Sequence, residues 1–386
     1  MFAFLRSAPT RRLVLVLLSL IGVLAVGVAI AVAATSSSGP VPAPKPLTAA
    51  LHDALAGPRV AGMTARIQFT NRLVESSSVG QGSPLLESGS GRLWASPDGR
   101  VRLELQSERG DVEILWDGTN VTVYDTTSDT VYKLALPGHA SEPASTDGSG
   151  IPSVAEIERM LVQLAADANV SGAIPSDVAG RATYTVQVAP KHDGGLLGSI
   201  QLAWDASNGT PLRAAVYAAG NPSPVLELAA TEIGYGPVEA SAFAISIPSG
   251  AKVVNLSPPA AGHSGDEVVR GASAVQSALP FNVAAPATLV GLPQREVRLA
   301  SVDSKDAALV VYGEGLGGIA VLESAADSSS HEKTLESLPT VSINGSTGHE
   351  LATALGTVLT FRQGGVQYTV IGSVPPAAAE AAARAL

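Results

Sequence analysis

Short apolar runs alternate with tight-turn signals between Gly89 and Leu136 of this chain, and this pattern constrains the fold more than any other feature. Pro97-Asp98-Gly99 and Asp117-Gly118 separate the runs. An Asp-Gly pair between such runs is a strong hairpin signal, because the turn needs residues that tolerate positive φ. The sequence therefore predicts an antiparallel meander, in which alternate side chains point to opposite faces.

The predicted meander has one charged face and one apolar face. Arg100, Arg102, Glu104 and Glu113 fall on the charged face, and Val101 falls on the apolar face. Seven further apolar positions are candidates for the wall of a ligand cavity: Leu93, Leu103, Leu105, Val112, Ile114, Val121 and Val123. The alternative is that this face is simply a core beneath helices. The block carries no obvious catalytic side chains, which favours a protein that holds an apolar molecule without transforming it.

Composition excludes several classes of site and partner. The chain has 386 residues, of which 46% are hydrophobic, so it can form the cores of two or three domains. It has no cysteine, which excludes disulfides, thiolate zinc sites and a lipid-modified N-terminal cysteine. Its 24 Lys and Arg against 34 Asp and Glu give a net charge of −10, which argues against nucleic acid as a partner.

The N-terminal region has the features of a membrane anchor. Residues 13–34 carry no charge and are long enough to cross a bilayer core, which takes about 20 apolar residues. Arginines in residues 1–12 place that end in the cytoplasm. We therefore expect a single-pass transmembrane helix in the cell membrane, with all later domains extracytoplasmic. The alternative is a signal peptide cleaved near Ala31-Val32-Ala33, which would release a secreted protein.

The folded region is expected to contain two helices among its strands. A Pro- and Ser-rich tether, residues 35–46, leads to a helix at 47–56. A second helix is expected at 153–167, where Ser153 and Glu156 form a capping box. The apolar residues on one face of this second helix are Ile157, Met160, Leu161 and Leu164.

Two β-rich units are expected, and the fold class is α+β with mostly antiparallel strands. Strands of the first unit outside the meander are expected at 63–74, 86–95, 181–189, 197–205, 212–219 and 226–235. Residues 257–279 lose all periodicity and are expected to be a linker. The second, smaller domain covers 280–386, and its Ala-rich tail from Ala377 is expected to form a frayed helix. Its strands are expected at 296–302, 307–312, 319–323, 340–343, 357–362 and 367–371.

Four short motifs in the first unit occur in the order of a known family. They are Gly91-x-Leu93-Trp94-x-x-Pro97, Asp111-x-x-x-Leu115-x-Asp117-Gly118, the strand end Tyr124-Asp125, and a Phe-x-x-x-x-Pro-x-Gly segment from Phe243. On these motifs, residues 47–256 resemble the bacterial lipoprotein carrier family LolA and its relatives LolB and RseB. The resemblance implies an open, strongly curved antiparallel half-barrel, closed by helices, whose concave apolar side receives acyl chains.

The resemblance also implies a role for the helices, and the chemistry of tryptophan suggests one for two tryptophans. The helices at 47–56 and 153–167 are expected to be lid elements, so the lid candidates are Ile157, Met160, Leu161 and Leu164. Trp94 and Trp116 stand at strand ends, as Trp204 does, and the first two are candidates for the rim of the cavity. Packing at hairpin ends is the alternative interpretation of all three.

Two departures from the carrier family weigh against the shuttling of lipoproteins. Ser96 stands before Pro97, where the carriers have an Arg that contacts the lid and helps ligand release. A carrier must also be soluble to cross its compartment, whereas this chain is expected to be tethered. Both departures leave the apolar cavity in place as a hypothesis.

The second unit is similar to a small β-rich domain of extracytoplasmic proteins linked to sigma-factor regulation. The similar stretches are Pro280-Phe281-x-Val283-x-x-Pro286, Leu309 to Tyr312, Ile319 to Leu322, and Gly365-x-x-Tyr368-x-Val370-x-Gly372. This similarity implies a sensing or interaction role, with an envelope protein as the partner of residues 280–386.

Three motifs that suggest other chemistry have simpler explanations. Gly313-x-Gly315-x-x-Gly318 fits a dinucleotide fingerprint, but the residues that follow suit a strand and not the required helix, so a Gly-rich hairpin is expected. Gly262 to Asp266 places His, Ser and Asp side by side, whereas a catalytic triad is built from distant segments. The six histidines never pair at the spacing of a zinc site. We therefore expect no cofactor, no metal and no catalytic residue.

Three hypotheses from different classes remain. The first is a membrane-anchored extracytoplasmic protein that binds a lipid or an acylated protein in the half-barrel. The second is an RseB-like envelope sensor or regulatory interaction protein without carrier activity. The third is a hydrolase, which lacks an assembled nucleophile and base. The sequence favours the first, and we expect no enzymatic activity.

Overall fold

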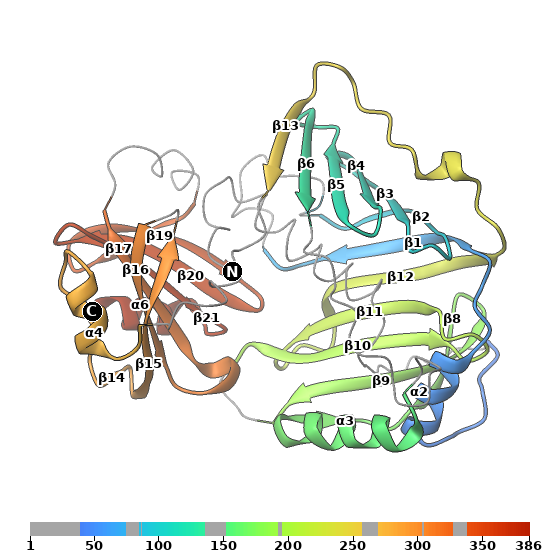
Figure 1. Cartoon of the computed structure of the whole chain (residues 1–386), viewed down its shortest axis with the longest axis horizontal. Helices are drawn as coiled ribbons and strands as arrows, with labels where there is room; N and C mark the ends of the chain where they lie inside the picture. Colours follow the sequence, from blue (N-terminus) through green and yellow to red (C-terminus); the bar gives the residue numbers. More distant parts are fainter. Residues whose placement is uncertain are drawn as a thin grey trace.

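The computed structural model describes residues 39–74, 85, 87–135, 152–191, 195–256, 269–302, 305–326 and 338–386. Within these ranges the chain forms two β-sheets with few helices (Figure 1). The expected cytoplasmic N-terminus and the expected transmembrane helix at 13–34 lie outside the described residues, as do Gly262 to Asp266. No helix in the described ranges is long and apolar enough to span a bilayer.

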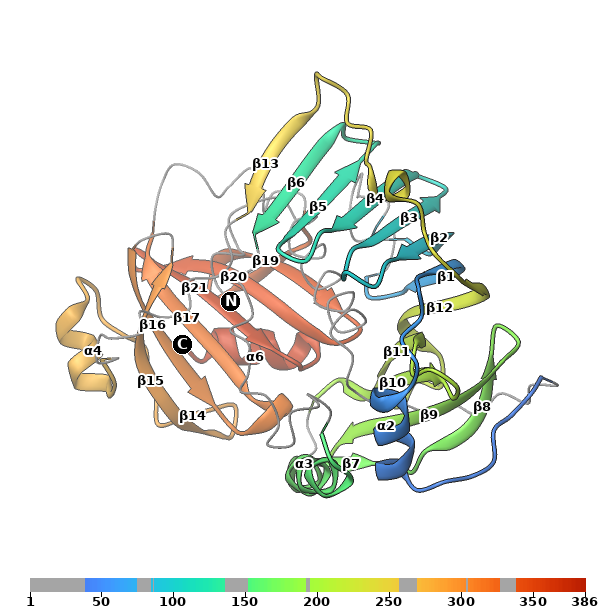
Figure 2. The same cartoon turned by 45° about the vertical axis from the view of Figure 1, so that its right-hand side comes forward.

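The first sheet has 13 strands in the order β13-β6-β5-β4-β3-β2-β1-β12-β11-β10-β9-β7, with β8 also paired to β9. Its pairs are antiparallel, except that β13 runs parallel to β6. The strands are β1 (Met63–Asn71), β2 (Gly89–Ala95), β3 (Val101–Ser107), β4 (Gly110–Trp116), β5 (Asn120–Asp125), β6 (Thr130–Ala135), β7 (Ala168–Val170), β8 (Ile174–Val178), β9 (Arg181–Pro190), β10 (Leu197–Asp205), β11 (Pro211–Ala218), β12 (Pro224–Tyr235) and β13 (Lys252–Leu256). The sheet curls into a half-open barrel, with β2 to β6 on one side and β9 to β12 on the other (Figures 1 and 2).

The predicted meander is present as β2 to β6, and its glycines explain its turns and the close approach of two of its strands. Gly99 and Gly118 have φ angles of +90° and +97°, which L side chains rarely adopt. Gly91 lies so close to β3 that a Cβ atom would be 1.8 Å from the Glu104 carbonyl oxygen. Glycine at this position therefore permits a close approach of β2 and β3 that any side chain would prevent.

Both expected helices of the first unit are present, as α2 (Leu47–Ala56) and α3 (Val154–Asp167). The predicted capping box is confirmed, because the Glu156 amide donates to Ser153 Oγ (3.3 Å) and the Ser153 amide donates to the Glu156 carboxylate (2.7 Å). The two helices share an apolar cluster with β9, β10 and β11, in which Ala50 and Trp204 are buried. They therefore cover one face of that half of the sheet.

Some segments of the first unit differ from the expectation. Residues 168–178 contain two short strands, β7 and β8, which the sequence pattern did not predict. The strand expected at 63–74 ends at Asn71, and the strand expected at 86–95 begins at Gly89. After β12, the turn η3 (Ala240–Phe243) lies against the outer face of the meander, where Arg102 donates to the Ala242 carbonyl oxygen (3.0 Å).

The second sheet has eight strands in the order β14-β15-β16-β17-β21-β20-β19-β18. They are β14 (Thr288–Leu289), β15 (Leu292–Val302), β16 (Lys305–Tyr312), β17 (Ile319–Ala325), β18 (Thr340–Ile343), β19 (Ser346–Thr353), β20 (Gly356–Gln363) and β21 (Val366–Gly372). The sequence pattern did not predict β14 or β19. The Gly-rich motif contains the short turn η4 (Gly315–Gly317) and leads into strand β17, as expected for a hairpin and not for a nucleotide site.

Two helices pack on the second sheet, and both correct an expectation. Part of the expected linker forms α4 (Ala272–Ala278), whose Val275 is fully buried in the core of this sheet. The Ala-rich tail is not frayed but forms α6 (Pro376–Arg384), in which Ala379, Ala382 and Ala383 are fully buried. Their small side chains let the helix lie close to the sheet.

The second unit contacts the first at the end of the half-barrel where β1 stops. The Ala354 amide donates to the Leu73 carbonyl oxygen (2.8 Å), and the Leu196 amide donates to the Ser373 carbonyl oxygen (2.9 Å). Ala354 and Leu355, in the turn between β19 and β20, pack against the core of the first sheet. This hairpin tip of the second unit therefore extends the core of the first.

Candidate ligand pocket in the half-barrel

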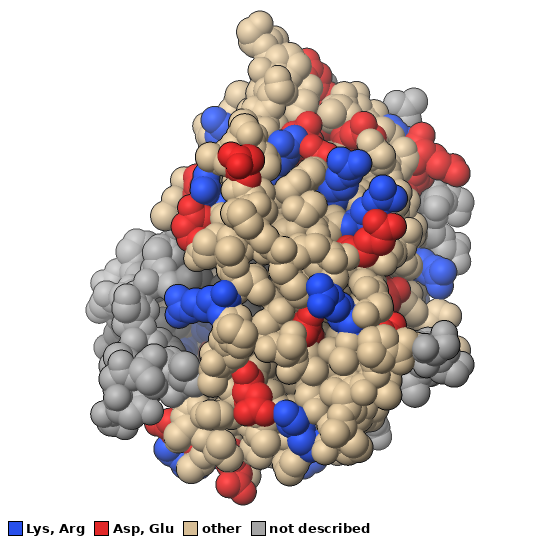
Figure 3. Space-filling view, turned by 90° about the vertical axis from the view of Figure 1, so that its right-hand side faces the viewer, with Lys and Arg blue, Asp and Glu red and all other residues tan. Residues whose placement is uncertain are grey.

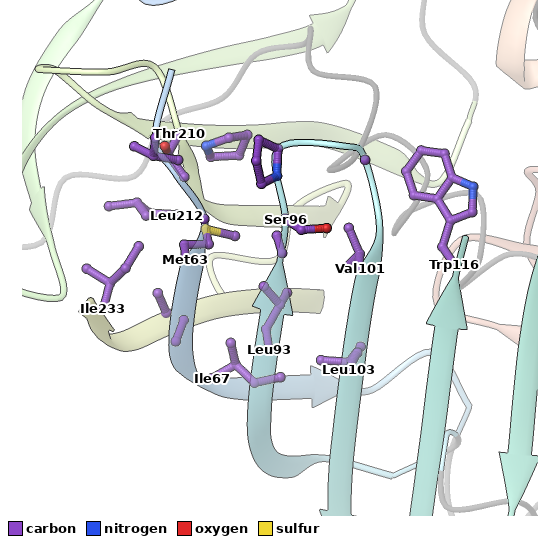
Figure 4. Close-up of a pocket in the computed structure, with 18 of the residues that line it drawn as sticks. Met63, Ile67, Leu93, Ser96, Val101, Leu103, Trp116, Thr210, Leu212 and Ile233 are labelled. Atoms are coloured by element: carbon purple, nitrogen blue, oxygen red, sulfur yellow. The ribbon is translucent and has the colours of Figure 1, made fainter. Parts of the chain in front are cut away.

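An apolar pocket of about 410 Å³ lies inside the half-barrel, where β1, β2 and β3 approach β11 and β12 (Figure 4). Strands β1 to β4 contribute Met63, Ala65, Ile67, Leu93, Ala95, Val101, Leu103 and Trp116. Strands β11 and β12 contribute Pro211, Leu212, Leu228, Ala230 and Ile233. Connecting segments contribute Val60, Gly62, Ser96, Pro97, Gly99, Gly118 and Thr210. None of these lining residues is charged.

Strand alternation and register bring the apolar residues of β1, β2 and β3 together. Ala65 is the register partner of Leu93, and Leu93 is in turn the partner of Leu103. Their side chains therefore lie next to one another on the concave face. Arg92 and Arg102 occupy the alternate positions and point to the outer face. The curl of the sheet then turns this apolar stripe toward β11 and β12 (Figure 4).

A β-bulge keeps β12 apolar on the pocket side. The register between β1 and β12 shifts at Arg66 and Ile67, which pair with Glu232 and Ala230 respectively. The extra residue on β12 lets Ala230 and Ile233 both line the pocket although they are three positions apart. Glu232 is thereby turned outward, where its carboxylate lies 3.3 Å from Arg66 Nε.

Two polar turns border the apolar wall. The Ser96 hydroxyl donates to the Asp98 carboxylate, and the Arg100 guanidinium lies 2.8 Å from the same carboxylate. The hydrogen bond from Ser96 is the main cause that lowers the pKa of Asp98. In the next turn, burial alone would raise the pKa of Asp117, but hydrogen bonds from the backbone amides and the side chains of Asn120 and Thr119 outweigh burial and bring the pKa to about 2. Both carboxylates are therefore charged at neutral pH, beside a wall that has no charge.

The turn between β10 and β11 lies next to the opposite wall of the pocket, which β11 and β12 form. The buried Asp205 carboxylate accepts hydrogen bonds from the Tyr235 hydroxyl (2.7 Å) and the Ser207 amide (2.8 Å). Burial favours the neutral acid, but the hydrogen bonds outweigh it and lower the pKa of Asp205. Gly209, with φ of +74°, packs beneath α2, because a Cβ atom there would lie 2.2 Å from the Ala54 carbonyl oxygen. The end of α2 is thereby fixed against this wall.

All seven candidate wall residues lie on the concave face, and two of them line the pocket. These two are Leu93 and Leu103. The other five are buried farther along the meander, in the apolar cluster that also contains Leu103: Leu105, Val112, Ile114, Val121 and Val123. The apolar face of the meander is therefore pocket wall on β2 and β3 and at Trp116 of β4, and packed core over the rest of β4 and on β5.

The tryptophans occupy three different environments. Trp116 lines the pocket, and its indole Nε1 is buried without a hydrogen-bond partner in the described part of the chain. Trp94 is not at the rim, because strand alternation turns it to the outer face, where the Arg102 guanidinium lies 5.5 Å from the ring centroid. Trp204 is buried beneath the helices.

The candidate lid residues of α3 do not line the pocket. Ile157 is buried and Leu161 packs on the cluster beneath the helices, whereas Met160 and Leu164 are 58% and 37% exposed. The helices nevertheless cover the concave side of the sheet. This follows from the register of β11 and β12, in which helix-covered Ala214 is the partner of pocket-lining Leu228.

The half of the pocket that comes from β1, β11 and β12 was not predictable from the sequence pattern. Apolar alternation was visible at Ala65 and Ile67, and again at Leu212 to Val216. The pairing of β1 with β12 was not, because these strands are far apart in the chain and spacing carries no information about such a pair. Only the three-dimensional register brings these side chains to one pocket.

Comparisons with known proteins concern the fold. No family model and no curated protein matches the chain. A chain of the Pseudomonas aeruginosa MucA/MucB complex is similar in structure, with 16% identity and a TM-score of 0.42. The alignment covers 87% of the present chain and 95% of the chain in that complex. An uncharacterized conserved protein from Thermus thermophilus matches 54% of this chain over 97% of its own length, with 11% identity and a TM-score of 0.33.

A LolA superfamily protein from Nitrosomonas europaea also matches. It aligns with 52% of this chain over 98% of its own length, with 11% identity and a TM-score of 0.23. The curled first sheet has the half-open form that the sequence resemblance implies.

Proposed function

We propose that this chain binds an acyl chain of a lipid or of an acylated protein in its pocket, without chemical change to the ligand. The observation that carries the proposal is the uncharged pocket of about 410 Å³ inside the half-barrel. Pockets for small molecules commonly measure about 300–1,000 Å³ and have mostly apolar walls. Each CH₂ group that moves from water to such a wall contributes about 0.8 kcal/mol, so a long acyl chain gains enough to bind.

The polar groups of the pocket support binding more than catalysis. The lining residues with polar side-chain atoms are Ser96, Thr210 and Trp116. Ser96 donates to Asp98, whose lowered pKa makes its carboxylate a weak base and a poor activator of a nucleophile. In the described ranges, no three His, Asp or Glu side chains cluster as a metal site requires.

We place this binding domain outside the cytoplasm, held at the cell membrane by residues 13–34. The uncharged length of that segment and the arginines before it support this location. The acidic balance of the chain supports a partner other than nucleic acid.

A matched pair of substitutions on β12 tests the proposal. Ala230 lines the pocket, whereas its neighbour Ala229 points to the outer face, and both are half-buried. Ala230→Phe fills the pocket and should weaken binding of a fluorescent fatty acid to the full-length protein at least about tenfold, or ~1.4 kcal/mol. Ala229→Phe should change the affinity by less than about twofold.

Circular dichroism and urea unfolding establish that both variants are folded. Equal affinities of the two folded variants, or no binding by the wild-type protein, would contradict the proposal. Mass spectrometry of lipids extracted from the purified wild-type protein then identifies the ligand class.

A second candidate function is that of an RseB-like sensor, which passes the state of the pocket to an envelope protein through residues 280–386. One observation favours it. Ala354 and Leu355 of the second unit pack against the same core that contains the pocket residues Ile67 and Leu103. Affinity for an envelope partner that changes when fatty acid is added would support this function. An affinity that does not respond to fatty acid would exclude it.

A further inference from the structure

The described part of the expected tether is packed against the first unit. The Tyr184 hydroxyl donates to the Ala43 carbonyl oxygen (2.6 Å), and Lys45 Nζ lies 2.7 Å from the Asp53 carboxylate of α2. Gly39 lies against Asp177 of β8, because a Cβ atom on Gly39 would be 2.2 Å from that carboxylate. Residues 39–46 therefore fix the point at which the chain leaves the folded domain toward its N-terminus.

This point lies at the same end of the sheet as the pocket. Asp177 pairs with Ala182 at the start of β9, and the Arg181 guanidinium lies 4.8 Å from the centroid of the Tyr235 ring at the end of β12. Tyr235 is the register partner of Met63, which lines the pocket. Figures 1 and 2 show the N-terminal segment, in blue, at this end of β9 to β12 and the second unit, in orange and red, on the other side.

The length of chain before Gly39 limits how the domain can stand on a membrane. Residues 35–38 alone separate Gly39 from the end of the apolar run at Ala34. Even when fully extended, the chain from Ala34 to Gly39 reaches about 18 Å. Strands β1 and β12 have 9 and 12 residues, so the sheet continues about 30 Å or more from this end. If the opposite end faced the bilayer, Gly39 would be farther from the surface than the chain can reach.

We propose that the pocket end of the first unit faces the bilayer that holds residues 13–34, and that the pocket exchanges its acyl chain directly with that bilayer. This inference rests on the proposed function and on the proposed anchor. Figure 3 looks onto this end of the molecule, where uncharged areas lie between Lys, Arg, Asp and Glu side chains. An uncharged path lets an acyl chain pass without removing fixed charges from water. The partner of this surface is therefore the lipid bilayer.

Two single-cysteine variants of the full-length chain test the orientation. The chain has no cysteine of its own, so one introduced thiol carries the only label. One variant is Ser207→Cys, at a residue in the exposed turn between β10 and β11 at the pocket end. The other is Ala219→Cys, at a residue in the exposed turn between β11 and β12 at the opposite end. Both proteins are inserted into phosphatidylcholine vesicles and labelled from outside with an impermeant fluorophore. Lipids with a nitroxide on the head group then quench fluorophores near the surface.

We expect the label at position 207 to be quenched at least about threefold more than the label at position 219, because the two ends differ in height above the bilayer. Equal quenching, stronger quenching at position 219, or failure of the protein to stay in the vesicles would overturn the proposal. Inserting about 40 Gly and Ser residues after Ser38 adds a linker with a span of about 35 Å and should abolish the difference. A difference that survives the insertion would overturn the argument from tether length.

This test separates the orientation from the proposed function. A protein that faces the bilayer but binds no fatty acid would still show the quenching difference. A protein that binds fatty acid in another orientation would lack the difference and keep its affinity.

Discussion

Glu323 lies in an environment that disfavours its charge. Its side chain is fully buried in the core of the second sheet, opposite Tyr368 in the register of β17 and β21. The Ala284 amide donates to one carboxyl oxygen (2.8 Å), and the other oxygen has no hydrogen-bond partner among the described residues. Burial raises the pKa of Glu323 to about 7, although the hydrogen bond from Ala284 opposes the shift.

This raised pKa predicts a loss of stability as the pH rises. Between pH 4.5, the ordinary pKa of Glu, and pH about 7, the folded state keeps a proton that the unfolded state has released. The unfolded state binds fewer protons, so the free energy of unfolding falls with rising pH, by up to about 3 kcal/mol. Glu323→Gln does not ionise and retains an acceptor for Ala284, so it should flatten this pH dependence. Urea unfolding at several pH values measures both proteins, and equal pH profiles would contradict the assignment.

Single residues of the pocket were predictable as far as strand alternation reaches. Alternation placed Leu93 and Leu103 on the concave face, and both line the pocket. The same rule turns Trp94 outward, so its expected place at the rim conflicted with the pattern that identified Leu93. Whether Val112 is pocket wall or packed core could not be predicted, because distant residues such as Leu73 and Leu134 pack in the same cluster.

At the scale of elements, α6 is the clearest test of packing. Ala382 is fully buried against the second sheet, whereas its neighbour Ala381 is exposed. Ala382→Glu should therefore destabilise the second unit by at least ~3 kcal/mol, because it forces a charge into an apolar contact. Ala381→Glu should change the stability by less than about 0.5 kcal/mol. Urea unfolding compares the two, and similar losses for both would mean that the helix is frayed.

Elements with strong local signals were predictable and those without were not. Asp-Gly turns predicted the meander, and the pair of Ser153 and Glu156 predicted the start of α3. Strand β7 has three residues and no alternation, so its pairing with β9 supplies the order that its own sequence lacks. The tail was expected to fray because alanines alone show no apolar stripe. Its burial depends on the sheet that it covers.

At the scale of the whole molecule, the hairpin tip at Leu355 joins the two units. Leu355 packs on the core of the first sheet, and the adjacent Ala354 amide is hydrogen-bonded to Leu73. Leu355→Ala should loosen this contact and speed hydrogen exchange of the Ala354 amide about tenfold, at a cost of ~1–2 kcal/mol. The control is Val290→Ala, at a residue that is 43% exposed. Unchanged exchange in the Leu355 variant would mean that the contact does not hold the units together.

The half-barrel as a whole was expected from the family resemblance and not from spacing. Strand β1 pairs with β12, which closes the middle of the sheet and creates the pocket. A local pattern cannot specify such a long-range pair. The end of the expected linker was placed too late in the chain for a related reason. Helix α4 is held by the second sheet and has no strong helical signal of its own, so its residues were counted as linker.

Quenching of tryptophan fluorescence by a brominated fatty acid tests most directly whether an acyl chain enters the pocket. The chain has 3 tryptophans, and of these only Trp116 lines the pocket. The brominated fatty acid should therefore quench the wild-type protein strongly and the folded Trp116→Phe variant weakly. No quenching of the wild-type protein, or equal quenching of the variant, would show that the acyl chain does not occupy this pocket.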